Sequence, residues 1–248
     1  MSSRGPVRLS LVLDAVAALR QRRLARQPDP LAIALLAEQA GADGVTLRLR
    51  ADRAEAQERD VERVAKAAPT RLNLRVAPSA ELLDVADRTK PAQCCLVPEQ
   101  RHDHAAGGGL DAVALRERLA QARGRLHEAG IEVAARIDPV IEQIDACAQA
   151  GLDAVELHCG AYALATDHDA LGKRLSSLET AAKHAAAAGL TVYAGGGLDY
   201  RNVAPVVAVA EVVELRIGHA IVANALVAGI EAAVVRMSRL LERRRPDA

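Results

Sequence analysis

The chain has 248 residues, of which 50% are hydrophobic, 26% are charged and only 1% are aromatic. This composition is ordinary for a soluble globular protein, and the near absence of aromatic rings excludes the stacking surfaces that bind single-stranded nucleic acid. Lysine plus arginine balance aspartate plus glutamate at 32 each, so the net charge gives no reason to expect nucleic acid or an anionic membrane as a partner.

The N-terminus has no apolar signal-peptide core, and no run of about 18 apolar residues could cross a membrane. The four cysteines fit neither a zinc-binding nor a Cys-x-x-Cys spacing, which indicates reduced thiols packed inside the protein. We therefore predict a cytoplasmic protein without a membrane segment.

Along the chain, eight short apolar segments alternate with longer segments of helical periodicity. The predicted strands are 8–14, 44–50, 71–76, 93–97, 132–138, 154–158, 191–194 and 212–217. The predicted helices are 15–23, 31–39, 79–87, 110–129, 140–150, 175–188, 202–209 and 220–243. The first of these helices is additional to the regular alternation.

Glycine closes several of the predicted helices just before a strand begins, at Gly41, Gly130, Gly151 and Gly189. Repeated helix–glycine–strand junctions are typical of a parallel α/β protein. Eight such units predict a single-domain (β/α)8 TIM barrel over residues 1–248, with an extra helix after strand 1. An open doubly wound sheet is the alternative.

In such a barrel the functional residues lie at the carboxyl ends of the strands. The clearest candidates for a binding site follow the last two predicted strands. Gly195-Gly196-Gly197 follows the seventh strand, while Gly218-His219 follows the eighth and opens the final helix. Backbone N–H groups of glycine loops and a helix N-terminus form a common phosphate site. We predict that Gly196, Gly197, Gly218 and His219 bind phosphate; the alternative is that the glycines only make tight turns.

Charged side chains also lie near the strand ends. Because side chains alternate along a strand, Arg48 and Arg50 share one face, and Glu156 and His158 share another. Asn73 and Arg75 likewise share a face of the third strand. If these faces point inward, the guanidiniums bind either an anionic substrate or internal carboxylates such as Glu156, and both interpretations remain open.

Other candidates are weaker. Asp14, at the end of the first strand, is either a catalytic base or a helix N-cap. The segments His102-Asp103-His104 and Asp167-His168-Asp169 lack a third metal ligand at motif spacing, so we predict no metal site. No lysine lies at a predicted strand end, which argues against Schiff-base chemistry.

Several of these stretches resemble the pyridoxine 5'-phosphate synthase family, and the match covers almost the whole chain. The most specific are Cys94-Cys95-Leu96-Val97-Pro98-Glu99, Glu156-Leu157-His158 and Gly218-His219-Ala220-Ile221. The resemblance implies a barrel, commonly an octamer built from dimers, that needs no metal or other cofactor. It implies condensation of 1-deoxy-D-xylulose 5-phosphate with 3-amino-2-oxopropyl phosphate.

For the site, the resemblance implies that Gly197, Gly218 and His219 hold a ligand phosphate. It also implies that Asp14, Arg23, Arg50 and Glu156 lie in or beside the pocket.

The sequence departs from the family pattern where the chemistry is expected. Arg48 and Gly196 stand where the family has histidines, Arg75 where it has a catalytic glutamate, and Glu55 where it has a second pocket histidine. Ring closure needs groups that gain and lose protons near neutral pH, which arginine does not do.

Three hypotheses follow. The first is a divergent barrel that binds a phosphorylated, multiply anionic small molecule through Arg48 and Arg75. It would catalyse a changed reaction, with Glu156, His158 or Asp14 as proton carrier. The second is an authentic pyridoxine 5'-phosphate synthase, and the third is a non-catalytic protein that binds a ligand or partner.

Overall fold

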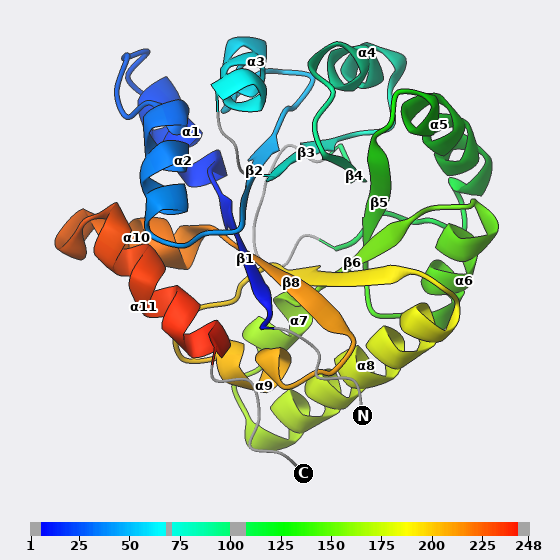
Figure 1. The fold of residues 1–248 in the computed structure, drawn as a ribbon. Coiled ribbons are helices and arrows are strands. Elements are labelled where there is room, and N and C mark those ends of the chain that lie inside the picture. Colours follow the sequence, from blue (N-terminus) through cyan, green and yellow to red (C-terminus); the bar gives the residue numbers. More distant parts are fainter. Residues whose placement is uncertain (1–5, 68–70, 100–107, 243–248) are drawn as a thin grey trace.

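The computed structural model describes residues 6–67, 71–99 and 108–242. Eight parallel strands form a closed barrel in the order β1 to β8, with β8 paired back to β1 (Figure 1). The prediction of a (β/α)8 barrel is confirmed, and the open sheet is excluded. The strands are β1 (Arg8–Val12), β2 (Gly44–Arg48), β3 (Arg71–Val76), β4 (Gln93–Leu96), β5 (Glu132–Ile137), β6 (Ala154–His158), β7 (Thr191–Gly195) and β8 (Val212–Ile217).

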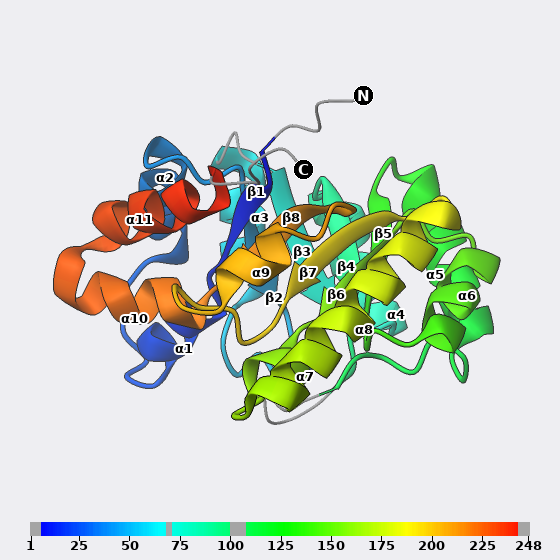
Figure 2. The same ribbon diagram turned by 90° about the horizontal axis from the view of Figure 1, so that it is seen from below.

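Helices form a ring around the barrel (Figure 1), and the side view shows helices packed against the strands (Figure 2). They are α1 (Asp14–Gln21), α2 (Pro30–Gln39), α3 (Glu58–Ala67), α4 (Ala80–Thr89), α5 (Arg116–Glu128), α6 (Ile141–Gln149), α7 (Gly160–Ala163), α8 (His168–Ala187), α9 (Val203–Val207), α10 (His219–Ala228) and α11 (Ile230–Glu242). The extra helix after the first strand is present as α1.

Two of the observed helices, α3 and α7, were not predicted from the sequence. The helix α3 is rich in charged residues, and its buried apolar residues are only Val61 and Val64, so few apolar residues mark it in the sequence. Its buried Asp60 instead receives two hydrogen bonds of 2.6 Å from Arg20 of α1, which fixes the two helices together. The other, α7, is a single short turn.

The predicted final helix is wrong as one continuous element. It is divided into α10 and α11 at Gly229, whose φ of +82° is a left-handed conformation that a helix cannot contain. The prediction also began α5 six residues early and shortened α8, where the first turns are polar.

An aliphatic shell packs between the strands and the surrounding helices, with Leu11, Leu47, Leu74 and Leu157 fully buried. All four cysteines are free and buried, as expected.

Inside the barrel, charged and polar side chains replace much of the branched aliphatic filling that such barrels usually have. The buried inward-facing set includes Ser10, Thr46, Asn73, Arg75, Gln93, Glu156, Glu214 and Arg216.

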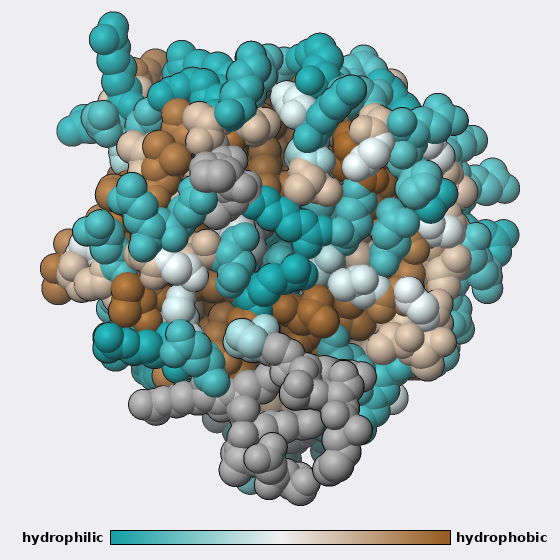
Figure 3. Space-filling model, viewed as in Figure 1, coloured by the Kyte–Doolittle hydropathy of each residue, from teal (hydrophilic) through white to brown (hydrophobic). Residues whose placement is uncertain are grey.

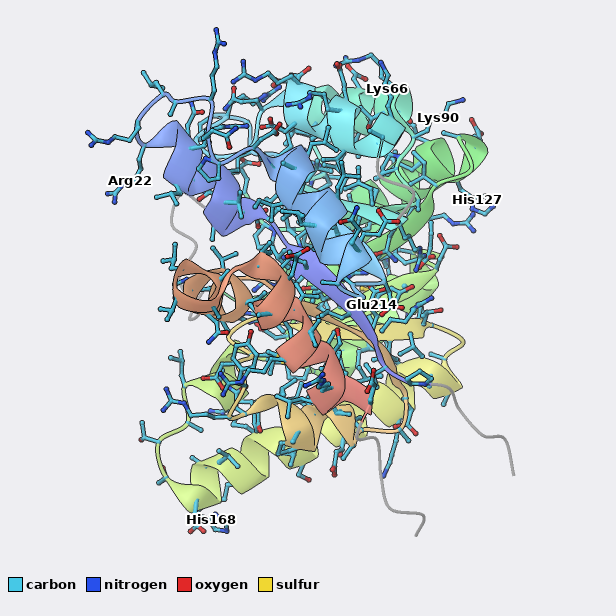
Figure 4. The ribbon with its side chains drawn as sticks, turned by 60° about the vertical axis from the view of Figure 1, so that its left-hand side comes forward. Arg22, Lys66, Lys90, His127, His168 and Glu214 are labelled. Atoms are coloured by element: carbon cyan, nitrogen blue, oxygen red, sulfur yellow. The ribbon has the colours of Figure 1, made fainter. Side chains whose placement is uncertain are left out.

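At the amino ends of the strands, this interior reaches the surface through half-buried Arg71 and Glu132, which form an ion pair. Hydrophilic side chains gather over the centre of this end of the molecule (Figure 3). Glu214 lies within the ring of helices (Figure 4), where it accepts a 3.1 Å hydrogen bond from Arg216. The polar column therefore continues from this end toward the opposite mouth. Within the described residues, no helix is long and apolar enough to cross a membrane.

Candidate functional site

A cavity of about 570 Å³ opens at the carboxyl ends of the strands. Its wall is built by the start of α1, the loop after β7 and the start of α10. Among the predicted site residues, it brings together Asp14, Arg75, Gly196, Gly197, Gly218 and His219.

The glycines at the rim have backbone conformations or contacts that suit no other residue. Gly196 and Gly197 have φ angles of +99° and +75°. A Cβ atom on Gly218 would lie 2.8 Å from both the Cβ and the carbonyl oxygen of Val12. Gly218 is the N-cap of α10 and the exposed His219 is its first residue, so the first N–H groups of this helix and its partial positive charge lie at the cavity wall.

Asp14 is the first residue of α1, and Leu13 is the N-cap, so the N-cap alternative for Asp14 is wrong. Its Oδ1 accepts a 2.8 Å hydrogen bond from the backbone N–H of Arg48. This contact joins the end of β1 to β2 and holds the carboxylate at the cavity wall.

Below the cavity, three guanidiniums converge on Glu156, whose side chain is fully buried. Arg75 donates to one carboxylate oxygen at 2.6 Å, and Arg216 donates to the other at 2.8 Å. The Nε atom of Arg136 lies 3.8 Å from Glu156, and the Cys95 thiol donates at 3.7 Å. Register explains the convergence, because Arg136 lies beside Glu156 on neighbouring strands.

These contacts determine the charge of Glu156. Burial alone would raise its pKa, but the positive charges of Arg75, Arg216 and Arg136 outweigh that effect and hold the pKa well below its ordinary value. Glu156 thus remains an anion, and the internal ion-pair interpretation fits its contacts better than a role in proton transfer.

His158 is the better placed proton carrier. Its side chain is buried, and Nδ1 lies 3.4 Å from the Asp138 carboxylate. The other ring nitrogen, Nε2, is buried and has no hydrogen-bond partner. A Cβ atom added to Gly196 would lie 2.9 Å from Nε2, so this nitrogen lies close to Gly196, which lines the cavity, although His158 itself is not a lining residue.

Among the four predicted substrate-binding arginines, only Arg75 lines the cavity. Arg48 is buried and donates to the carbonyl oxygen of Pro98 at 2.9 Å. Arg50 makes two 3.0 Å hydrogen bonds to Asp52, which lower the pKa of that carboxyl group to about 2. Arg23 is exposed after the end of α1, where its neighbour Arg22 extends outward (Figure 4).

The sequence analysis did not name Arg136 or Arg216 as site residues, yet both line the cavity. Side chains alternate along β8, so Arg216 lies on the same face as Gly218. The sequence pattern could therefore have indicated that Arg216 lies near the site. Glu55 also lines the cavity, and there the signal was the family resemblance, which has a pocket histidine at this position.

No group of three potential metal ligands occurs in the described part of the chain. His168 begins α8 and points away from the barrel (Figure 4). The His102-Asp103-His104 segment lies outside the described residues.

Comparison with known proteins identifies the family. Residues 9–243 match the model of the family described as "Pyridoxal phosphate biosynthesis protein PdxJ". The chain belongs to the PdxJ family. Pyridoxine 5'-phosphate synthase of Magnetococcus marinus is 47% identical over 94% of this chain and 96% of its own length. The enzyme of the same name from Pseudoalteromonas translucida is 45% identical, with the same shares covered.

Solved structures of lower identity share the fold. KGPDC from Streptococcus mutans aligns with a TM-score of 0.66 at 12% identity, covering 96% of this chain and 98% of that one. Tryptophan synthase from M. tuberculosis aligns with a TM-score of 0.63 at 13% identity, covering 96% and 94%. For this PdxJ-family chain, the names of the close relatives favour the authentic synthase over a divergent reaction.

Proposed function

We propose that this protein binds phosphorylated substrates at the carboxyl-terminal mouth of its barrel and forms pyridoxine 5'-phosphate. The observation that carries the proposal is the 43–47% identity to pyridoxine 5'-phosphate synthases over 94–98% of the chain. The cavity supports it, because the glycine loop after β7 and the N-terminus of α10 meet there as a phosphate site would require.

In this proposal, Gly196, Gly197, Gly218 and His219 surround the phosphate of one substrate. His158 transfers protons through Nε2, and Asp138 orients its ring. Asp14 is a second candidate for proton transfer, whereas Glu156 stabilises the buried arginines.

The reaction is expected to be slow. Family resemblance places proton-transferring side chains at three positions that are Arg48, Arg75 and Gly196 in this chain. Removal of one such group typically lowers a rate by about 10²–10⁴-fold. The remaining groups would therefore sustain turnover well below that of the close relatives.

The direct test supplies the purified protein with 1-deoxy-D-xylulose 5-phosphate and 3-amino-2-oxopropyl phosphate and measures pyridoxine 5'-phosphate. The Magnetococcus marinus relative, assayed in parallel, shows that the substrates are competent. We expect slow product formation that His158→Gln lowers further, while His127→Gln on the surface of α5 leaves it unchanged (Figure 4). No product from the native protein would contradict the synthase proposal.

A second function, a changed reaction on a phosphorylated and multiply anionic substrate, is favoured by the ion pairs of Glu156 with Arg75 and Arg216. The Glu156–Arg75 pair places a fixed positive charge at the position where the family resemblance has a catalytic glutamate. Binding of a phosphorylated ligand with no product in the synthase assay would support this function. The cavity that remains above Arg75 argues against a non-catalytic protein whose barrel mouth is simply filled.

We also infer a cytoplasmic homo-oligomer, a dimer or an octamer. The helix α10 is almost entirely apolar, yet only Ile221 is buried, and Leu226 and Val227 are 75% and 92% exposed. Apolar surface of this kind is typical of subunit contacts. Sedimentation at micromolar concentration measures the assembly directly.

A further inference from the structure

Three arginines line the cavity, and two of them are paired with carboxylates inside the barrel. Arg216 donates hydrogen bonds to Glu214 at 3.1 Å and to Glu156 at 2.8 Å. Arg75 donates to the other oxygen of Glu156 at 2.6 Å, and its charge also interacts with Asp14. The positive charge of both guanidiniums is therefore balanced within the protein.

Arg136, the third arginine, also has carboxylates nearby. Its Nε atom lies 3.8 Å from Glu156. The hydrogen bond from His158 and the nearby charge of Arg136 both lower the pKa of the Asp138 carboxyl group. Among these described groups the carboxylates are at least as numerous as the arginines, so the arginines give the cavity no excess of positive charge that would repel a cation.

Glu55 adds a further carboxylate to the wall of the cavity. It lies in the loop between β2 and α3. Its backbone carbonyl oxygen accepts hydrogen bonds of 3.5 Å from Arg20 and 3.4 Å from the side chain of Gln57, neither of which lines the cavity. Because the carbonyl is directed toward these two residues, the carboxylate is the group through which Glu55 would contact a ligand.

The loop that carries Glu55 is held in place by its own contacts. Asp60 accepts two 2.6 Å hydrogen bonds from Arg20 and one of 2.8 Å from the backbone N–H of Gln57. Ala56, the residue after Glu55, is only 1% exposed. The position of Glu55 is therefore set by the fold before any ligand binds, which lowers the entropy lost on binding.

Arg50 is a positive charge that interacts with Glu55, but its two 3.0 Å hydrogen bonds go to Asp52. These bonds make the largest contribution to the raised pKa of Arg50, and the charge of Glu55 adds to it. A carboxylate has about four positions at which it accepts hydrogen bonds, so Glu55 has capacity for a ligand besides its contacts within the protein.

The cavity has two walls of opposite character. Backbone N–H groups and the partial positive charge of the α10 N-terminus lie at the loops after β7 and β8, whereas Asp14 and Glu55 follow β1 and β2. The strand order β7–β8–β1–β2 places these loops side by side around the mouth. The Nε2 atom of His158 is an independent indication of a ligand here, because it is buried, has no hydrogen-bond partner and lies close to Gly196.

We propose that Glu55 binds a protonated amino group of a ligand whose phosphate lies at Gly197 and the N-terminus of α10. Hydrogen bonds from an ammonium to a carboxylate are charge-assisted and about twice as strong as neutral ones. The inference rests on the proposed function, since one of the two proposed substrates, 3-amino-2-oxopropyl phosphate, has both groups. Glu55 stands where the family pattern has a histidine, so a carboxylate contact at this position departs from that pattern.

Titration calorimetry at neutral pH tests the inference on the native protein. The probes are 2-aminoethyl phosphate and 3-aminopropyl phosphate. Propyl phosphate and butyl phosphate are their partners of equal length, in which a methyl group replaces the ammonium. We expect at least one amino phosphate to bind about tenfold or more tightly than its alkyl partner.

Two other results of this titration would each overturn the inference, and they differ in what else they exclude. Equal or weaker binding of both amino phosphates, compared with their alkyl partners, would remove the ammonium site and leave the phosphate site in place. If none of the four probes binds, the phosphate site itself has failed, and the ammonium site with it.

Variants locate the effect. Glu55→Gln keeps the size of the side chain and should remove the advantage of the amino phosphate, while the affinity for its alkyl partner stays within about twofold. Asp14→Asn tests the neighbouring carboxylate, and a loss of the advantage there but not in Glu55→Gln would contradict the assignment to Glu55. Glu128→Gln, on the exposed end of α5, is the matched control and should change neither affinity. An unchanged advantage in a folded Glu55→Gln protein would overturn the proposal.

Discussion

At the scale of single residues, Gly196 is a position at the cavity where a side chain has no room. Its φ is +99°, and an added Cβ would lie 2.6 Å from Cδ2 of His158 and 3.1 Å from Nη2 of Arg136. Any side chain here would press against the His158 ring and against the guanidinium of Arg136, which lines the cavity. The sequence predicts that this glycine belongs to a phosphate loop, but only the structure reveals how closely it approaches His158.

We predict that Gly196→Ala destabilises the protein by about 1–3 kcal/mol, from backbone strain and overpacking together. The free energy of unfolding from urea denaturation measures the effect. Gly124→Ala is the matched control, because Gly124 lies within α5 with open space around it and should gain about 0.5–1 kcal/mol. A Gly196→Ala protein as stable as the native one would contradict this packing.

A second prediction at this scale concerns Glu156. Glu156→Gln removes the negative charge beside the buried guanidiniums of Arg75 and Arg216 and should cost about 3–5 kcal/mol, the usual penalty for breaking a buried ion pair. Glu128→Gln, on the exposed end of α5, should cost little. Urea denaturation of both variants measures the difference.

The pH dependence of stability follows from the same carboxylate. Its pKa in the folded protein is lowered from an ordinary value of 4.5. The stabilisation from the ionised carboxylate is therefore complete above about pH 4.5 and is lost as the pH falls below that value. The native protein should lose stability more steeply than Glu156→Gln on acidification in this range; parallel curves would contradict the ion-pair account.

At the scale of elements, one junction occurs twice in the chain. Gly41 and Gly151 end helices with positive φ angles, and each is followed two residues later by an aspartate. Asp43 accepts a 2.8 Å hydrogen bond from the N–H of Leu9, and Asp153 accepts one of the same length from Val133. Each aspartate thus ties the start of its own strand to the start of the preceding one.

We predict that Asp43→Ala lowers the free energy of unfolding by about 1–3 kcal/mol, because it leaves a strand N–H without its charged acceptor. Glu128→Ala, an exposed helical carboxylate without such a contact, serves as the control. Phosphate binding should be unchanged, because Asp43 lies at the amino end of β2 and the cavity lies at the carboxyl ends. A loss of ligand affinity without a loss of stability would contradict this separation.

The sequence predicted elements well where apolar periodicity was strong and poorly where polar contacts hold an element in place. All eight strands were found within one or two residues of their observed ends, because each is a short buried apolar segment. The helix α3 was missed because its attachment depends on the pair Arg20–Asp60, which no local pattern reveals. The break at Gly229 depends on a positive φ angle. Glycine can adopt such an angle, but the presence of a glycine in the sequence does not show that it does.

At the scale of the whole molecule, the barrel has a polar interior that runs between its two ends. The closed sheet was predictable from eight repeated units, and the position of the site followed from the architecture. The partners of the arginines were not predictable, because Arg75, Glu156 and Arg216 come from β3, β6 and β8 and meet only when the barrel closes. Strand alternation identified the inward face but did not reveal which charges would pair across it.

The central claim is that the loop after β7 and the N-terminus of α10 bind a ligand phosphate at the mouth of this barrel. A crystal structure of the protein soaked with glycerol 3-phosphate tests it most directly. The account predicts phosphate density within hydrogen-bonding distance of the backbone N–H groups of Gly197 and His219. A well-ordered, fully accessible mouth without phosphate density at saturating ligand, or phosphate bound elsewhere on the molecule, would contradict it.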